Sequence, residues 1–311
     1  MILCLTPNSA VDRTALVPRL TFGDVLRPTA VLTLPGGKGN NVARAVVASG
    51  ALAATTGFVG GHAGRWLVEA LEAEGLNPRF VVVEGETRTT YVTVDASGRS
   101  TLVYEPGVPV TDADADRLID LIRATLLPAA TWSAICGSPP PGLRPERYRD
   151  FVDASHTADR PCAVDVGGEP LSCALLAGPD VVKVTRDEAA SVLGGARDAL
   201  AAAQALVSRG SGLAVVTDGP GGAAACDGRS AWRIEVPPIR AVDAVGSGDA
   251  FTAGLIVSLA AGRPVDEALA IAAATGTANA EVPGAGRFDP ARQAELVDQI
   301  RVRRHRLAGA S

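Results

Sequence analysis

Short apolar runs alternate along this chain with longer segments in which apolar and polar residues recur at helical spacing. "ILCLT" at 2–6 and "TTGFVG" at 55–60 are runs of the first kind, whereas "NNVARAVVASG" at 40–50 and "GRWLVEALEAEG" at 64–75 have helical spacing. Runs that are apolar throughout predict strands covered on both faces, and strands that alternate with helices predict parallel pairing through crossover helices. We therefore expect an α/β fold whose doubly wound, mostly parallel sheet is flanked by helices. The same rhythm predicts further elements at 79–83, 116–126, 132–138, 146–155, 161–167, 180–184, 197–210, 213–219 and 249–262.

Two stretches in the N-terminal half interrupt this rhythm. Residues 13–34 contain no convincing helical pattern, and "TRTTYVTVDASGRSTLVYEPG" at 87–107 alternates with period two on both sides of an "ASGR" turn. Such alternation around a turn predicts an antiparallel hairpin with one exposed face. We expect a single domain over 1–311 in which about 13–34 and 87–107 form a small β-sheet lid over the carboxyl ends of the strands, where ligands bind in such folds. The exposed face of the lid also predicts a homodimer in which two lids pair.

Composition changes this picture only by excluding some classes of function. The chain has 311 residues, 47% of them hydrophobic and 20% charged, which is enough to bury a core. Its net charge of −5 argues against a nucleic-acid partner held by phosphate neutralisation. The charge-free stretch 45–64 is interrupted by glycines and polar residues, and it predicts helix, turn and strand rather than a membrane span. Five scattered cysteines without CxxC spacing predict reduced thiols in the cytoplasm, and the basic end at 301–307 predicts a solvated terminal turn.

The stretch "AVDAVGSGDAFTAG" at 241–254 places a carboxylate between a glycine turn and an apolar helix. The backbone amides of Gly246, Ser247 and Gly248 at a helix N-terminus would form an anion hole for the charge that develops during phosphoryl transfer. Asp249, within reach of an attacking hydroxyl, would act as the general base. The alternative is a tight turn in which Asp249 is only the N-cap of the helix.

A second glycine turn, "PGGKGNNVARA" at 35–45, begins another predicted helix. Gly36 and Gly37 would let the backbone approach a ligand, toward which Lys38 and Asn41 would project. The spacing is neither that of a Walker A loop nor GxGxxG. A capped turn without a ligand is the alternative.

Lysine is rare in this chain. Of the 29 basic residues only Lys38 and Lys183 are lysines, and both stand in candidate sites. The ammonium group is a compact charge that commonly binds phosphate.

Two loops that follow predicted strands are further candidates. In "VVTDGPGGAAA" at 215–225 the Thr217 hydroxyl and the backbone at Gly219 and Gly222 would suit polyphosphate contacts, unless the loop is only a β-turn. In "KVTRDEA" at 183–189, Glu188 lies in the first turn of a predicted helix, where an acid is favourable in any case. Its functional interpretation is a carboxylate that orders Mg²⁺ and its waters near phosphates.

These sites, in this order, resemble those of the PfkB (ribokinase-like) family of sugar kinases. The likeness covers nearly the whole chain, through "TPNSAVDRT", "PGGKGNNVARA", "GFVGGHAG", "GETRTTYVTVD", "CGSPPPG", "VDVGG", "KVTRDE", "TDGPGG" and "DAVGSGD". The lysine of "GGKGNN" and the "TR" at 87–88 most resemble the family's phosphosugar branch, which includes 1-phosphofructokinases and tagatose-6-phosphate kinases. The resemblance implies ATP- and Mg²⁺-dependent phosphorylation of a phosphohexose, with fructose 1-phosphate as first choice. Tagatose 6-phosphate, fructose 6-phosphate, an unphosphorylated sugar or a nucleoside are alternative acceptors, and a catalytically weak phosphosugar-binding regulator is a second alternative.

The resemblance also implies a role for each candidate residue. Asp249 would take the proton of the sugar hydroxyl beside the anion hole of residues 246–248. The residues implied at the acceptor sugar and its phosphate are Asp12, Gly36, Gly37, Lys38, Asn41, Arg88 and Ser138. Those implied at ATP are Lys183, Thr185, Thr217, Gly219 and Gly222, and Glu188 would order Mg²⁺.

The chain departs from the family pattern at three positions. Ser9 follows Asn8 where the family has Asn-Pro, Ala244 replaces a threonine, and Thr185 replaces the asparagine of a Lys-Pro-Asn-x-x-Glu run. A threonine hydroxyl still bonds water but lacks the paired donor and acceptor of an amide. The third departure therefore bears on how the metal is held, while the base and the anion hole are retained.

Overall fold

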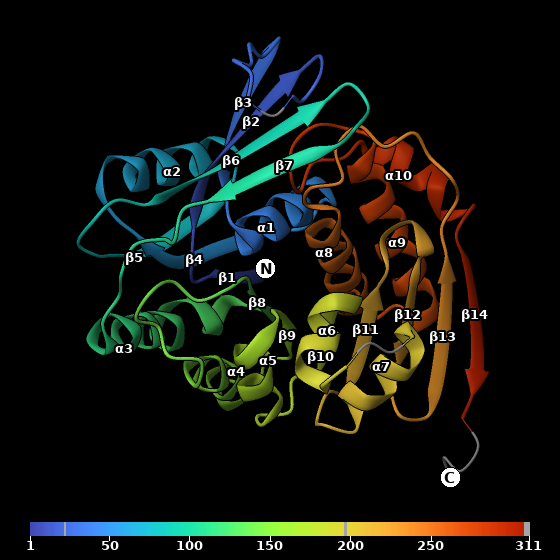
Figure 1. Ribbon diagram of the computed structural model, residues 1–311. Helices are drawn as coiled ribbons and strands as arrows, with labels where there is room; N and C mark the ends of the chain where they lie inside the picture. Colours follow the sequence, from blue (N-terminus) through green and yellow to red (C-terminus); the bar gives the residue numbers. More distant parts are fainter. Residues whose placement is uncertain (22, 196–197, 308–311) are drawn as a thin grey trace.

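A sheet of ten strands forms the middle layer of the computed structural model, which describes residues 1–21, 23–195 and 198–307 (Figure 1). One run of neighbouring strands is parallel, and the three strands at one edge are antiparallel. The parallel strands, in spatial order, are β11 (Leu213–Thr217), β10 (Val181–Thr185), β9 (Cys162–Asp165), β8 (Trp132–Cys136), β1 (Ile2–Thr6), β4 (Ala53–Val59) and β5 (Asn77–Val82). The antiparallel edge continues from β11 through β12 (Ala223–Cys226), β13 (Ser230–Glu235) and β14 (Arg301–Arg306).

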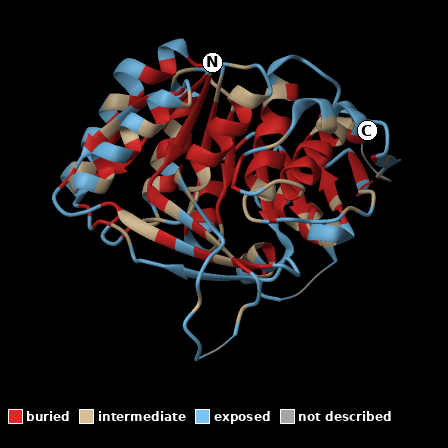
Figure 2. Ribbon diagram, turned by 90° about the horizontal axis from the view of Figure 1, so that it is seen from above, coloured by how far each residue is buried: buried red, intermediate tan, exposed pale blue. Residues whose placement is uncertain are grey.

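Helices cover both faces of this sheet and enclose two apolar cores. Alternate side chains of β1 point to opposite faces, so that Leu3 and Leu5 join one core and Ile2 and Cys4 join the other. The first core packs against α3 (Asp112–Leu121), α4 (Arg147–Thr157), α5 (Gly168–Leu175), α6 (Arg186–Leu193) and α7 (Ala199–Val207), with the short turns η1 (Ile122–Leu126) and η2 (Leu127–Ala129). The second packs against α1 (Lys38–Ala48), α2 (Gly61–Ala73), α8 (Ser247–Ala260), α9 (Val265–Ala280) and α10 (Pro290–Val297). The buried residues form a continuous central layer (Figure 2).

This architecture confirms the expected α/β fold with a mostly parallel sheet flanked by helices. The helix predicted at 197–210 is present as α7, and residue 197 lies outside the described residues. The pattern does not predict α9, because 11 of its 16 residues are buried and no clear polar face reveals the helical period.

The prediction of a terminal turn at 301–307 is wrong, because residues 301–306 form the edge strand β14. Arg304 pairs with Trp232 of β13, and its guanidinium carbon lies 5.6 Å from the centre of the indole ring. Arginine stems cover apolar surface while their charged ends stay in water, so a basic segment can complete a sheet. Charged side chains also protect an open edge from further pairing.

A separate four-stranded sheet stands above the main one (Figure 1). It consists of β3 (Ala30–Gly36), β2 (Ala10–Val17), β6 (Arg88–Asp95) and β7 (Ser100–Tyr104), in that spatial order. The pair β6–β7 confirms the predicted antiparallel hairpin, and β2 joins the two hairpins by pairing in parallel with β6. We call this sheet the lid. Its closing function stays a prediction.

The order of the strands determines where a ligand can bind. β1 lies between β8 and β4, so the chain winds outward from it in both directions. The crevice at the carboxyl ends of strands beside such a switch point is the usual binding place in α/β sheets. The loops after β1, β8, β9, β10 and β11 all begin there, because these strands are parallel.

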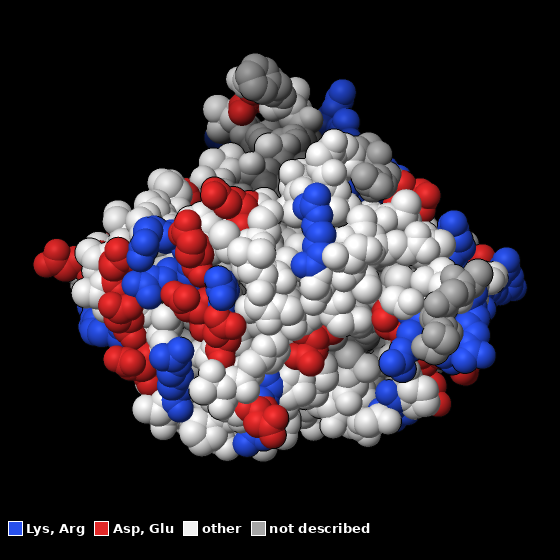
Figure 3. Space-filling model, turned by 90° about the horizontal axis from the view of Figure 1, so that it is seen from below, with Lys and Arg blue, Asp and Glu red and all other residues white. Residues whose placement is uncertain are grey.

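The outer surface adds two observations. Over α3 and α4, acidic and basic side chains are interspersed (Figure 3), and Arg147 there forms ion pairs with Asp112, Asp116 and Asp150. No helix of the described chain is both long enough and apolar enough to cross a membrane.

Candidate active site

Asp249 lies in the first turn of α8, at the carboxyl edge of the main sheet. The N-cap of this helix is Gly246, whose φ of 83° lies in the left-handed region that favours glycine. The first bond of the helix runs from the Ala250 amide to the Gly246 carbonyl at 2.9 Å. The alternative in which Asp249 is itself the N-cap is therefore wrong, and its carboxylate is left for another task.

Two residues of α1 hold the Asp249 carboxylate. Asn41 Nδ2 donates to Asp249 Oδ2 at 2.8 Å, and Arg44 Nη1 donates to Asn41 Oδ1 at 3.0 Å. The arginine thus fixes the amide with its NH₂ group toward Asp249. Arg44 is itself tied to the Ala285 carbonyl at 2.8 Å and to Glu74 Oε2 at 2.8 Å.

The environment of Asp249 makes it a stronger base than an ordinary carboxylate. It is 5% exposed. Burial, and then the nearby charge of Asp165, raise its pKa from 3.8 to about 6, although Lys38, Lys183 and Asn41 act in the opposite direction. A carboxylate with this pKa is still ionised at pH 7 and accepts a proton more readily.

The start of α8 also presents backbone donors. The amides of Gly248 and Asp249 precede the first helical bond and are left for a ligand, whereas the Ser247 amide donates to the Ala244 carbonyl at 3.2 Å. Gly248 lies close to a cation, because a Cβ built on it would be 2.6 Å from Lys183 Nζ. A larger residue would therefore displace the ammonium group. These amides and the ammonium together provide positive potential beside Asp249.

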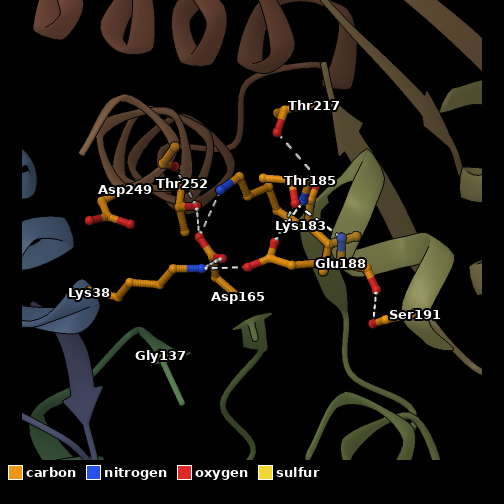
Figure 4. A network of polar contacts seen from close by, with 12 residues as sticks. Lys38, Gly137, Asp165, Lys183, Thr185, Glu188, Ser191, Thr217, Asp249 and Thr252 are labelled. Carbon is orange, nitrogen blue, oxygen red and sulfur yellow. Dashed lines mark hydrogen bonds and ion pairs between the residues drawn. The ribbon is translucent and has the colours of Figure 1, made fainter. Parts of the chain in front are cut away.

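A buried carboxylate, Asp165, binds both lysines of the chain (Figure 4). Its Oδ1 accepts from Lys38 Nζ at 3.1 Å, and its Oδ2 accepts from Lys183 Nζ at 3.0 Å and from Thr252 Oγ1 at 2.8 Å. Asp165 is fully buried, which would raise its pKa, but the two lysines and Thr252 outweigh burial and lower it to about 2. Asp165 therefore stays charged at any ordinary pH.

Lys38 also contacts a second carboxylate, because its Nζ lies 3.0 Å from Glu188 Oε1. Burial lowers the pKa of Lys38, but Asp165 and Glu188 outweigh it and the net shift is upward. For Glu188 burial raises the pKa, and Lys38 and the Thr185 amide bring it below its ordinary value. Lys38, predicted to bind the sugar, and Glu188, predicted to order the metal, are thus joined directly by an ion pair.

Thr185 and Glu188 form a capping box at the start of α6. Thr185 Oγ1 accepts from the Glu188 amide at 3.2 Å and donates to Glu188 Oε2 at 3.0 Å, and the Thr185 amide donates to the same oxygen at 2.8 Å. Threonine and asparagine are both good N-cap residues. The departure from the family pattern at this position therefore preserves the local structure.

The lid contributes Asp12 and Arg88 on neighbouring strands, with Thr90 opposite Asp12 and Ala10 opposite Arg88. Burial raises the pKa of Asp12 to about 6, against the effects of Arg44, Thr90 and Arg88. Arg88 donates to the Asn8 carbonyl at 3.1 Å and to the Glu105 carbonyl at 3.2 Å.

The remaining predicted residues lie at the loops and turns named by the sequence. Gly36 lies under the Asp12 carboxylate, Gly37 is the N-cap of α1, and Ser138 is exposed in the loop after β8.

Thr217 ends β11, and its hydroxyl donates to the Val184 carbonyl at 3.4 Å. Gly219 is exposed, whereas Gly222 is buried against the Ile234 carbonyl of β13. The structure joins Lys38 and Lys183 through Asp165, and Glu188 is joined to them through Lys38. Asn41 and Asp249 form a separate bonded pair, and Asp249 is close enough to Lys38 and Lys183 for their charges to lower its pKa.

Residues 4–292 match the model of the pfkB family carbohydrate kinases. The chain belongs to this family. A 1-phosphofructokinase of Rhodobacter capsulatus is 33% identical over 279 residues, which are 88% of each chain. The ATP-dependent 6-phosphofructokinase isozyme 2 of Escherichia coli is 30% identical over 284 residues, 89% of this chain and 91% of that protein. Among solved structures, phosphofructokinase-2 from Escherichia coli in complex with potassium superposes with a TM-score of 0.87 at 27% identity, covering 96% of this chain and 98% of the other.

Membership of the pfkB family confirms the ribokinase-like fold and makes this chain a sugar kinase, which transfers phosphate to a hydroxyl group. ATP is the phosphate donor that this family implies. The names of the relatives support a phosphosugar as the acceptor.

The sequence prediction missed Asp165, Thr252 and Arg44 as parts of this pfkB site. Asp165 is the last residue of β9, as Thr185 is of β10 and Thr217 of β11. A polar residue at the carboxyl end of an apolar parallel strand is a signal that could have identified it.

The raised pKa of Asp249 predicts a pH profile. If Asp249 is the general base that the sequence predicts, it must be ionised to accept a proton, so kcat/KM should level off above about pH 6 and fall about tenfold per pH unit below it. Replacing Asn41 with Ala removes a donor that lowers this pKa, so its midpoint should move to higher pH. The measurement is the pH dependence of kcat/KM for both proteins, and a plateau that persists to pH 4.5 would contradict the assignment.

The capping box predicts different effects for two replacements of Thr185. Thr185→Ala removes the cap and should lower the free energy of unfolding by about 1 kcal/mol. Thr185→Asn keeps an N-cap and should stay close to wild type. Urea unfolding measures both, and equal destabilisation by the two variants would show that the cap does not stabilise α6.

Proposed function

We propose that this chain is an ATP- and Mg²⁺-dependent kinase that converts fructose 1-phosphate into fructose 1,6-bisphosphate. The observation that supports it most is the buried Asp249 carboxylate, held by Asn41 at a helix N-terminus beside two lysines. The name of the Rhodobacter relative favours fructose 1-phosphate. The name of the Escherichia coli relative keeps fructose 6-phosphate as an alternative acceptor.

In this proposal Asp249 accepts the proton of the acceptor hydroxyl. The hydroxyl oxygen then attacks the γ-phosphorus of ATP, the bond to the bridging oxygen breaks, and ADP leaves with the electron pair. The raised pKa of Asp249 suits this proton transfer near neutral pH.

Backbone amides and lysines would stabilise the transferring phosphate. The amides at the start of α8 point out of the helix beside Asp249, and Lys183 Nζ lies next to Gly248. Charge that develops on the γ-phosphate oxygens would be neutralised there. Lys183 is 2% exposed and bonded to Asp165, so it is positioned before the substrates bind.

Asp165 and Glu188 fit a magnesium site. Mg²⁺ is usually held by one or two carboxylates together with substrate phosphates rather than by a full set of protein ligands. The described residues contain no group of three or more His, Cys, Asp or Glu that could hold a metal alone, but Asp165 Oδ1 and Glu188 Oε1 both contact one cationic atom, Lys38 Nζ. When bound, the metal would neutralise charge on the ATP phosphates.

The acceptor would bind between the lid and α1. Asp12 would bond the sugar hydroxyls, and Gly36, Gly37 and Asn41 would line the acceptor site. Two observations support this: Gly36 lies against the Asp12 carboxylate, and Gly37 is the N-cap of α1. Arg88, Lys38 and Ser138 would hold the phosphate that the acceptor already contains. At the donor side, Thr217 and the backbone at Gly219 would contact ATP.

The test is ADP release from ATP and Mg²⁺ with fructose 1-phosphate, fructose 6-phosphate, tagatose 6-phosphate, free fructose, ribose and adenosine. The strongest activity should be on fructose 1-phosphate. The isosteric variant Asp249→Asn should fold normally by circular dichroism and lose about a hundredfold or more in kcat, as expected for loss of a general base.

Two results would count against the proposal. Turnover of only an unphosphorylated acceptor would remove the phosphate-binding roles of Lys38 and Arg88. Unchanged kcat in Asp249→Asn would remove the base.

We also propose that the lids of two copies pair in a homodimer. Every residue of the edge strand β7 is exposed, including Leu102, Val103 and Tyr104, which are 39%, 60% and 59% exposed. Apolar side chains on an open edge strand favour pairing with a second copy. Light scattering at micromolar concentration should give a dimer for wild type and a monomer for Leu102→Lys/Val103→Lys, and a monomeric wild type would contradict the pairing.

A further inference from the structure

The ammonium group of Lys38 lies between two carboxylates that come from different parts of the fold. Asp165 Oδ1, at the end of β9, is 3.1 Å from Lys38 Nζ, and Glu188 Oε1, in the first turn of α6, is 3.0 Å from it (Figure 4). One positive charge therefore joins the two acids that the proposed function assigns to Mg²⁺. A divalent cation placed between the same oxygens would meet this like charge at close range, which is strongly unfavourable in a partly buried site.

The side chain of Lys38 is more exposed than that of Lys183 and can move away from the carboxylates more easily. The Lys38 side chain is 33% exposed and that of Lys183 is 2% exposed. A flexible four-carbon stem can swing an exposed ammonium to another anion, and Lys38 begins α1 directly after the turn at Gly36 and Gly37.

The two carboxylates are held by other groups as well. Asp165 Oδ2 keeps its bonds to Lys183 and Thr252, and Glu188 Oε2 keeps its bonds to the amide and hydroxyl of Thr185. The departure of Lys38 would therefore leave Asp165 neutralised and Glu188 in position. What it would free is one oxygen on each carboxylate, Asp165 Oδ1 and Glu188 Oε1.

We propose that Lys38 closes the divalent-cation site of the ligand-free enzyme, and that the phosphate of the acceptor sugar opens the site by drawing the ammonium away. This inference rests on the proposed function, because it needs a phosphosugar as the acceptor. Binding of the phosphosugar and of the cation are then coupled positively, since each favours the position of Lys38 that the other requires. Lys38 acts here as a gate for the metal in addition to its contact with the substrate phosphate.

The experiment measures binding of Mn²⁺, followed by its electron paramagnetic resonance signal, without nucleotide and with or without fructose 1-phosphate. Without the sugar, Lys38→Met should bind Mn²⁺ more tightly than wild type, by about 5- to 150-fold, the usual range of coupling between sites. Fructose 1-phosphate should tighten Mn²⁺ binding to wild type and have no such effect on Lys38→Met.

Two further variants separate the gate from a general effect of charge. Lys183→Met removes an equal charge from the same carboxylate but not from Glu188, so it should tighten Mn²⁺ binding far less. Lys38→Met/Glu188→Gln lacks one of the freed ligands and should lose the gain. A melting curve for each variant shows whether it is folded, and the double variant keeps the test decisive if Lys183→Met does not fold.

The outcomes distinguish this inference from the proposed function. Equal Mn²⁺ affinity for Lys38→Met and wild type would overturn the gate, even if fructose 1-phosphate is phosphorylated. Tighter binding in Lys38→Met without any effect of fructose 1-phosphate on wild type would overturn the opening step and would point to failure of the phosphosugar assignment.

Discussion

The site depends on the neutralisation of one fully buried carboxylate. Burying a charge without a partner costs several kcal/mol of folding free energy. The folded chain must therefore provide partners for Asp165. Lys38, Lys183 and Thr252 provide them, and they come from α1, β10 and α8. Burying Asp165 at the end of β9 therefore fixes the relative positions of α1, β10 and α8, to which we assign the acceptor, the donor and the general base. The ion pairs of Arg147 over α3 and α4 have no comparable effect, because its partners Asp112 and Asp116 are 57% and 62% exposed and water screens their charges.

Burial and the same network together explain why the pKa of Asp249 is raised. Asp165, Glu188 and Asp249 share the positive charge of only two lysines. Both ammonium groups donate to Asp165, and that of Lys38 also donates to Glu188. Among the residues that the structure describes, Asp249 has only the neutral side-chain amide of Asn41 within bonding distance. Burial raises the pKa of Asp249 most, and the uncompensated charge of Asp165 raises it further, at the residue that we propose as the proton acceptor.

Local pattern was sufficient for most of the fold, and it failed where long-range contacts decide the outcome. Apolar strands, amphipathic helices and the hairpin at 87–107 are determined by neighbouring residues, so α1, α2 and β6–β7 were predictable. Residues 301–306 look like a solvated tail until Trp232 is known to lie beside them. In the site, Asp249 and the glycines before it were predictable from the turn. Asp165 was not assigned a role, because its partners are distant in sequence: Lys38 lies 127 residues away and Thr252 lies 87 residues away.

The parallel pair β2–β6 has a consequence for selectivity. The two lid hairpins enter the fold at different points, one between β1 and α1 and the other between β5 and α3. A two-stranded ribbon is barely stable alone, so each hairpin depends on the other for its order. Their pairing register also sets how Asp12 stands relative to Arg88, and a slip of one residue would turn one of them to the opposite face. If Asp12 and Arg88 bind the acceptor as we propose, the identity of the sugar that fits depends on the alignment of two insertions as well as on the side chains that they present.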